Sequence, residues 1–314
     1  MSSIAPFRLA PFFRTRPWGF QDLRPWYDYR TTGEPIGEVW LTGEMCIAET
    51  GPFAGHTLKA ITAQHPRELL GEAAAAGEFP LLIKMLFPKE KLSVQVHPDD
   101  ALAQKHGFPR GKTECWYALD AQPDASVALG LKPGSTPEQI RAAIHDATLE
   151  KYMTWLPVKK GDMIYVDAGT VHAIGPGAVI LETQQTSDLT YRMYDYGSAR
   201  ELHVDLAMEA ARMTTRAGKV DPVAEGDHSV LVNEHYFRVE KWPLDAGQAP
   251  AGLGDAKDRV QVLFCAEGSL EIDGEGWETV TIQPWQLAVI PARTSIRVHC
   301  SVRSEVICIV PVAI

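Results

Sequence analysis

The stretch Gly161-Asp162-Met163-Ile164-Tyr165-Val166-Asp167-Ala168-Gly169-Thr170-Val171-His172 decides the fold that we predict for this chain. A short apolar run is followed by turn residues and a second apolar segment, a pattern typical of strand, tight turn and strand. A second stretch of the same length and punctuation follows later: Trp285-Gln286-Leu287-Ala288-Val289-Ile290-Pro291-Ala292-Arg293-Thr294-Ser295-Ile296. Two copies of one β-unit favour two related β-domains.

Both stretches resemble the second sequence motif of the cupin superfamily, G-x5-P-x-G-x2-H. The first copy keeps the motif's two glycines and its histidine, with an aspartate in the proline slot: Gly161, Gly169, His172 and Asp167. The second copy keeps the proline as Pro291, whereas Arg293 takes a glycine slot and Ile296 takes the histidine slot. The resemblance implies a mainly β fold with two cupin-type, jelly-roll-like barrels, of which only the first can hold a metal.

The composition is that of a soluble globular protein, with 314 residues, 45% hydrophobic, and no run long enough to span a bilayer. The net charge of −10 argues against a nucleic-acid partner, so an anionic substrate needs locally placed lysines and arginines. The five cysteines are odd in number and lack C-x-x-C spacing, which indicates free thiols in a reducing cytosol. The N-terminal stretch keeps its arginines and has no signal-peptide core, so we expect no export.

The rest of the chain suggests two parts joined by a linker. We expect a metal-binding catalytic domain over residues 1–216, a linker over 217–230, and a C-terminal barrel without metal ligands over 231–314. Seven short strand-like segments fill the last of these parts. Helices are expected over 65–76, 99–105 and 204–216, together with a helical insertion at about 134–156.

The first part also holds a group of polar residues on predicted strands. Gln95 and His97 alternate around Val96, so both side chains point to one face of a strand that Pro98 ends. Alone, this pair fits two interpretations equally well: part of a metal site, or a core-facing glutamine next to a hydrogen-bonded histidine. Glu114 lies among apolar neighbours, so it is either turned to solvent or buried against a cation. With His172, these residues offer two imidazoles, a carboxylate and an amide, which suits an open site for Zn²⁺, Fe²⁺ or Mn²⁺.

Four segments, in order, resemble type I mannose-6-phosphate isomerase, and its short bacterial form in particular: LSVQVHPDD at Leu92–Asp100, GKTECWY at Gly111–Tyr117, GTVHAIG at Gly169–Gly175 and ETQQTSDLTYRMYDYG at Glu182–Gly197. The resemblance implies a zinc-dependent enzyme that interconverts mannose 6-phosphate and fructose 6-phosphate. It assigns the metal to His97, Glu114 and His172, with Gln95 as a fourth ligand in many members. It places Arg192 and Lys112 in the active site, and Lys84 is a further candidate cation.

The implied chemistry passes through a cis-enediolate, whose developing charge a metal can stabilise. Arg192 can stabilise that charge or hold the phosphate, and the group that takes the C2 proton is open between a metal-bound water, Lys112 and a carboxylate. Lys84 interrupts a buried apolar strand, as a buried cation or a snorkelling lysine.

Two alternative functions are a non-catalytic sugar-phosphate sensor and a metal-dependent oxygenase, and the oxygenase predicts His-x-His where Gln95 stands. Two stretches depart from the family pattern, Trp18-Gly19-Phe20 and Gly37-Glu38-Val39-Trp40, and they bear on which sugar phosphate is preferred. We expect a cytoplasmic monomer or homodimer that acts on a small sugar phosphate, with no nucleic-acid or membrane partner.

Overall fold

The computed structural model describes residues 4–254 and 258–312. The chain forms two compact units, one made of residues 1–12, 40–83 and 221–314 and the other of residues 13–39 and 84–220. We call them unit 1 and unit 2. The units interleave along the sequence, whereas the sequence places one boundary at 217–230. The predicted domain limits therefore stay a prediction.

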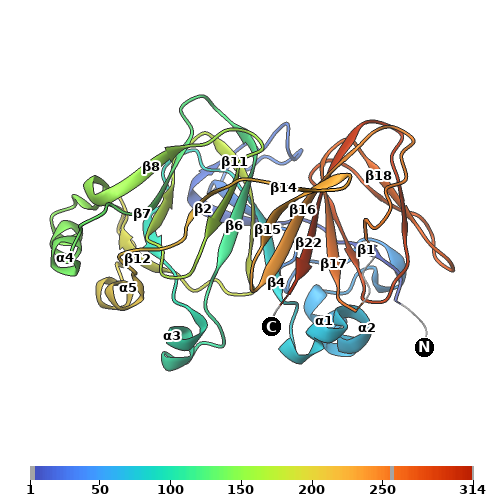
Figure 1. The fold of residues 1–314 in the computed structure, drawn as a ribbon, viewed down its shortest axis with the longest axis horizontal. Helices are drawn as coiled ribbons and strands as arrows, with labels where there is room; N and C mark the ends of the chain where they lie inside the picture. Colours follow the sequence, from blue (N-terminus) through green and yellow to red (C-terminus); the bar gives the residue numbers. More distant parts are fainter. Residues whose placement is uncertain (1–3, 255–257, 313–314) are drawn as a thin grey trace. The chain divides into compact units, whose positions relative to one another are not determined.

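Unit 2 is built around two β-sheets (Figure 1). The larger has the order β13 (Gly218–Val220), β9 (Met163–Val166), β6 (Glu114–Ala121), β11 (Ala178–Gln185), β4 (Leu81–Leu86), β3 (Ile36–Trp40) and β2 (Phe12–Phe20). The smaller has the order β12 (Tyr191–Tyr194), β5 (Val94–Val96), β10 (His172–Ile174), β7 (Ser126–Leu131) and β8 (Met153–Pro157).

The two sheets of unit 2 pack face to face through one apolar cluster. Trp116 and Ile180 come from the larger sheet and Val127 from the smaller, and all three are fully buried. This is how a jelly-roll excludes water, because alternate residues of each strand point inward. A second cluster joins the smaller sheet to α4 (Pro137–His145) and α5 (Val204–Ala210). The mainly β cupin fold predicted from the sequence is confirmed.

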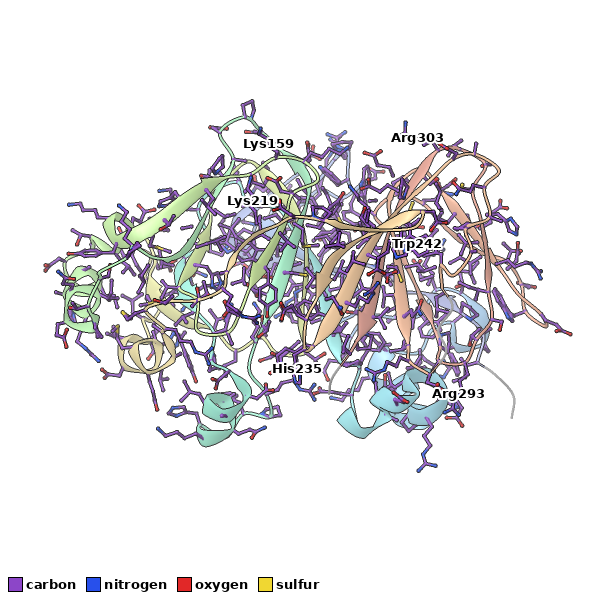
Figure 2. The ribbon with its side chains drawn as sticks, in the orientation of Figure 1. Lys159, Lys219, His235, Trp242, Arg293 and Arg303 are labelled. Carbon is purple, nitrogen blue, oxygen red and sulfur yellow. The ribbon has the colours of Figure 1, made fainter. Side chains whose placement is uncertain are left out.

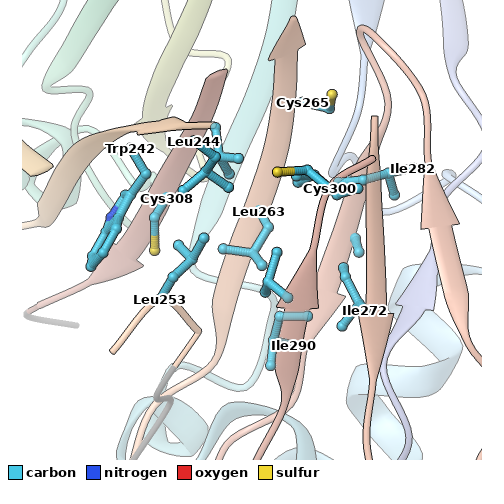
Figure 3. Packing of buried hydrophobic residues seen from close by; sticks show 14 of the residues in the cluster. Trp242, Leu244, Leu253, Leu263, Cys265, Ile272, Ile282, Ile290, Cys300 and Cys308 are labelled. Atoms are coloured by element: carbon cyan, nitrogen blue, oxygen red, sulfur yellow. The ribbon is translucent and has the colours of Figure 1, made fainter. Parts of the chain in front are cut away.

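Unit 1 has the same two-sheet plan. Its larger sheet has the order β1 (Phe7–Arg8), β20 (Leu287–Ile290), β17 (Gln261–Glu267), β22 (Ser304–Pro311), β16 (Phe237–Leu244), β15 (His228–Asn233) and β14 (Val223–Glu225). Its smaller sheet contains β19 (Val280–Ile282), β18 (Leu270–Asp273) and β21 (Arg297–His299). Figure 3 shows Leu263, Ile272 and Ile290 packed together in the interior of this unit. The interior of unit 1 is therefore filled by apolar side chains.

The repeated stretch has a positive φ at two matching positions in both units. Gly161 and Gly169 have positive φ values of 87° and 88°. Trp285 and Arg293, which occupy the matching slots, have φ values of 66° and 60°, and Arg293 is labelled in Figure 2. Residues other than glycine rarely adopt a positive φ. The turn geometry is therefore kept at these two positions although the glycines have been replaced. Ile296, in the histidine slot, packs against the apolar cluster.

The structure corrects several expected helices. The helix expected over 65–76 is divided into α2 (Pro66–Leu70) and a 3₁₀ turn, η2 (Glu72–Ala76), because Gly71 between them has a φ of 63°. The helix expected over 204–216 ends at Ala210. In the insertion, α4 and the turn η3 (Leu149–Tyr152) are followed by β8, so its last residues are strand.

The expected linker 217–230 contains β13 and β14 and the start of β15. The remaining helices are η1 (Gly51–Phe53), α1 (Leu58–Gln64) and α3 (Asp100–Lys105). Asp99 caps α3 by accepting a hydrogen bond from Leu102 N, as expected for a residue at a helix start. All five cysteines are buried and free. Within the described residues, none of the helices has the length and apolar character needed to cross a membrane.

Candidate active site

The register of the smaller sheet of unit 2 places three predicted site residues side by side. Gln95 on β5 pairs with His172 on β10 and, on its other side, with Arg192 on β12. Glu114 begins β6 in the larger sheet, and His97 directly follows β5. Residues far apart in the sequence therefore meet between the two sheets.

His97, Glu114 and His172 form a cluster whose ligand atoms all lie within 4.8 Å of one another. His97 Nε2 is 3.6 Å from Glu114 Oε2, and His172 Nε2 is 3.4 Å from Glu114 Oε1. All three side chains are buried, with at most 2% of their surface exposed. Two imidazoles and a carboxylate arranged in this way could hold a divalent metal ion.

The hydrogen bonds of the two histidines turn one nitrogen of each ring toward Glu114. His97 Nδ1 donates to the carbonyl of Leu189 at 2.9 Å, and His172 Nδ1 donates to the carbonyl of Thr170 at 2.9 Å. Each Nε2 atom then carries a lone pair, which is how metal-bound histidines are commonly oriented. His97 Nε2 and Glu114 Oε1 are buried without a hydrogen-bond partner, an expensive state that a bound cation would relieve. The residues present therefore fit a metal.

Burial keeps both imidazoles neutral. It lowers the pKa of His97 well below its usual range and that of His172 to about 4. The nearby charge of Lys112 acts in the same direction on both rings. Neutral imidazole is the form that binds a metal.

Gln95 lies beside the cluster. Its side-chain nitrogen donates to His172 Nε2 at 3.2 Å, the atom that a metal would use. Its side-chain oxygen accepts a hydrogen bond from Ser93 Oγ at 3.4 Å. Its assignment as a fourth ligand stays a prediction.

A row of buried charges of alternating sign leads away from the cluster. Lys112 Nζ is 2.7 Å from Glu114 Oε2 and 3.9 Å from Glu182 Oε1. Lys84 Nζ is 2.9 Å from Glu182 Oε2 and 4.0 Å from Glu38. Lys84 is therefore a buried, paired cation and does not snorkel.

Two of the carboxylates in this row, Glu114 and Glu182, have pKa values shifted in opposite directions. Burial raises the pKa of Glu114 above its usual value, although Lys112 opposes the shift. Burial acts the same way on Glu182, but two lysines outweigh it and lower its pKa. Burial would lower the pKa of Lys84, yet Glu182, Glu38 and Asp188 raise it overall, so this lysine stays charged.

A cavity of about 390 Å³ opens beside this row. Its wall carries five cationic side chains, Arg16, Lys84, Lys112, Arg192 and Arg200, and three carboxylates, Glu38, Glu182 and Asp188. The wall thus has an excess of positive charge in a chain whose net charge is −10. Such a pocket suits a small, polar, negatively charged molecule.

Sequence reasoning missed three residues of this region: Arg16, Glu182 and Arg200. Arg16 binds Glu38 through two hydrogen bonds, of 2.8 and 3.1 Å, and nothing in the sequence signals that contact. Glu182 could have been found, because the alternation of β11 places it on the buried face beside Trp116, whose Nε1 donates to it at 3.2 Å.

Comparisons with known proteins find similar sequences and similar structures. The family model for the catalytic domain of type I phosphomannose isomerase matches residues 7–132. A probable mannose-6-phosphate isomerase of Bacillus subtilis is 37% identical over 259 residues, which cover 78% of this chain and 81% of that protein. A mannose-6-phosphate isomerase of Streptococcus mutans is 36% identical and covers 76% of this chain and 79% of its own length.

Solved structures are similar over nearly the whole chain. A crystal structure of the mannose 6-phosphate isomerase from Bacillus subtilis has a TM-score of 0.85 and 30% identity, and the alignment covers 97% of this chain and 99% of that one. A phosphomannose isomerase variant from Salmonella typhimurium has a TM-score of 0.79 at 16% identity, which shows the shared fold alone. Sequence and fold together place this chain in the type I mannose-6-phosphate isomerase family.

Proposed function

We propose that this protein interconverts mannose 6-phosphate and fructose 6-phosphate as a metal-dependent aldose–ketose isomerase. One observation carries the proposal: a buried His–Glu–His cluster lies beside a small cavity whose wall holds more cations than carboxylates. A metal held by the cluster would bind the sugar oxygens at the reacting carbons, and the cations of the cavity wall would bind the phosphate of the same sugar. The sensor and oxygenase alternatives find no specific support in this site.

Zinc is the metal that we propose, held by His97, Glu114 and His172, with Gln95 as the provisional fourth ligand. Nitrogen and carboxylate donors suit Zn²⁺, although Fe²⁺ and Mn²⁺ accept the same set. When bound, the cation would supply Lewis-acid stabilisation of the negative charge that develops on the sugar oxygens. The orphaned buried atoms of His97 and Glu114 support this assignment.

The chain's own residues take two further roles. Lys112 presents an ammonium group next to Glu114, where it would donate a hydrogen bond to the enediolate oxygen and act as a general acid toward that oxygen. Arg192 lies on the cavity wall with a guanidinium that stays charged, and it would hold the phosphate. Holding both ends of the sugar phosphate fixes its reacting carbons beside the cluster.

We further propose that the protein works in a reducing cytosol, since all five of its buried cysteines are free. Residues 1–216 would supply the catalytic part. The active form would be a monomer or homodimer.

The test is a coupled assay that measures fructose 6-phosphate formed from mannose 6-phosphate, before and after a chelator and after metal is restored. We expect turnover that the chelator abolishes and Zn²⁺ restores. Measurable binding of the sugar phosphate without turnover at any divalent metal would contradict the proposal and favour a sensor.

A further inference from the structure

Asp195 follows the end of β12 and is buried, with 6% of its surface exposed. It does not line the cavity, but both of its carboxylate oxygens hold a residue that does. Arg200 Nε donates to Oδ2 at 2.7 Å, and Arg200 Nη2 donates to Oδ1 at 2.6 Å. A paired fork of this kind fixes the plane of the guanidinium as well as its position.

Arg192 relates to the same carboxylate differently. Its Nε lies 4.0 Å from Asp195 Oδ2, is buried and has no hydrogen-bond partner. Its Nη1 donates to the carbonyl of Glu201 at 2.8 Å. Arg192 is thus held near Asp195 without a hydrogen bond to it. Its Nε–H group therefore remains able to donate a hydrogen bond to a ligand.

Two guanidiniums side by side repel each other, and the carboxylate between them offsets this repulsion. The proximity of Arg200, together with burial, lowers the pKa of Arg192, whereas Asp195 acts in the opposite direction. Both side chains line the cavity, whose wall holds more cations than carboxylates. Asp195 is the carboxylate that lies within 4.0 Å of both arginines among the described residues.

The loop that carries Asp195 and Arg200 is also anchored. Tyr196 has a positive φ of 51°, which a residue with a side chain rarely adopts unless its surroundings hold it there. Its hydroxyl donates to Glu150 Oε1 at 3.0 Å, and Glu150 also binds Lys91 at 2.7 Å. Ser198 N donates to the carbonyl of Asp195 at 2.9 Å. The position of Asp195 is therefore set by the fold.

We propose that Asp195 is a positioning residue that sets the spacing and orientation of Arg192 and Arg200, so that both guanidiniums receive one phosphate group of the substrate. The inference rests on the proposed function, because it takes the substrate to be a sugar phosphate. Asp195 itself does not touch the substrate.

The test compares Asp195→Asn with wild type and with a matched control, Asp205→Asn. Asp205 also pairs with an arginine, Arg141 at 2.6 Å, but its side chain is 90% exposed and does not line the active-site cavity. We expect Asp195→Asn to raise KM for mannose 6-phosphate by about tenfold or more and to leave kcat within about threefold, because lost uniform binding acts on KM. The control should match wild type.

A second readout is independent of turnover. The dissociation constants of fructose 6-phosphate and of inorganic phosphate, measured by calorimetry and by competition, should rise together in Asp195→Asn. Adding Arg200→Ala to this variant should cost less than the two single changes predict, because the two residues act as a unit. If Asp195→Asn does not fold, Arg200→Ala tests the same clamp and should show the same rise in KM.

A KM and phosphate affinity within twofold of wild type would overturn the inference, as would a fall in kcat with KM unchanged. Failure of the function itself looks different. If wild type binds fructose 6-phosphate without turnover, the isomerase proposal falls. The ratio of dissociation constants between Asp195→Asn and wild type still decides the role of Asp195.

Discussion

The candidate site is defined by a few buried polar atoms. His97 Nε2, His172 Nε2 and the Glu114 carboxylate would be costly to bury without a partner, and the fold nevertheless points them at one another. The sequence could identify these three residues from their strand positions and from the resemblance of their motifs. It could not identify Arg16, because its partner Glu38 becomes a neighbour only through the pairing of β2 with β3, which the sequence does not reveal.

His172→Ala should remove the bound metal and leave the fold intact. The substitution deletes one of three ligands, and we expect metal affinity to fall by more than about 100-fold, since even residues that only orient the ligands matter by 10- to 100-fold. Metal content measured by mass spectrometry and the far-UV circular dichroism spectrum check this. His145→Ala, on the exposed end of α4, is the control and should keep its metal. Full occupancy in His172→Ala would show that the ligands are misassigned.

Lys112→Met should separate catalysis from metal binding. Lys112 is 3% exposed and 2.7 Å from Glu114, but it is not itself a metal ligand. We expect kcat to fall by about 100-fold or more, the usual worth of a group that assists proton transfer, while the metal stays bound. Lys105→Met removes an exposed lysine paired with Glu209 and should leave kcat unchanged. Near-normal kcat in Lys112→Met would remove this lysine from the mechanism.

At the scale of elements, the strand–turn–strand segment at 161–172 connects the fold to the site. Its turn places His172 on β10, and Gly169 N donates to the carbonyl of His97 at 2.8 Å, so one turn positions two of the predicted ligands. The strands of both units could be predicted because their apolar patterns are strong. The helix expected over 99–105 is present, but those expected over 65–76 and 204–216 end early; in the first of them the positive φ of Gly71 ends a helix that composition alone would continue.

Replacing either glycine of the 161–172 segment should lower the free energy of unfolding, but by different amounts. A Cβ on Gly169 would lie 2.7 Å from Arg212 Cγ and would sit on a backbone with a φ of 88°. We expect Gly169→Ala to lower the free energy of unfolding by about 2–4 kcal/mol, through backbone strain plus the displaced side chain, and to weaken metal binding. Gly161→Ala meets no atom within 4 Å, so strain of about 1 kcal/mol should be its whole cost. Urea titrations measure both, and equal costs would contradict the steric argument.

For the whole molecule, the sequence predicts the class of fold better than its division. Apolar periodicity and the repeated stretch indicate two β-units. The grouping of residues 1–12 and 40–83 with residues 221–314 depends on contacts between segments that are distant in the sequence. Apolar periodicity describes each segment separately and does not predict such contacts. The chain consequently passes between the two units four times, so neither unit is one continuous segment.

This interleaving predicts that the two units unfold together, and the cysteines can report it. Cys115 belongs to unit 2, whereas Cys46, Cys265, Cys300 and Cys308 belong to unit 1. Burial raises the pKa of Cys46 and of Cys265 to about 12, so alkylation near pH 8 requires unfolding. A metal present at 100 times its dissociation constant stabilises the native state by about 2.7 kcal/mol, and should slow alkylation about 100-fold.

If the units unfold as one, metal bound in unit 2 should protect all five cysteines by the same factor. Peptide mapping of alkylated protein, with and without metal, measures each site separately. Denatured protein, in which every cysteine reacts, provides the reference rate. Protection confined to Cys115 would mean that unit 2 unfolds on its own, and that four passages of the chain between the units do not couple them.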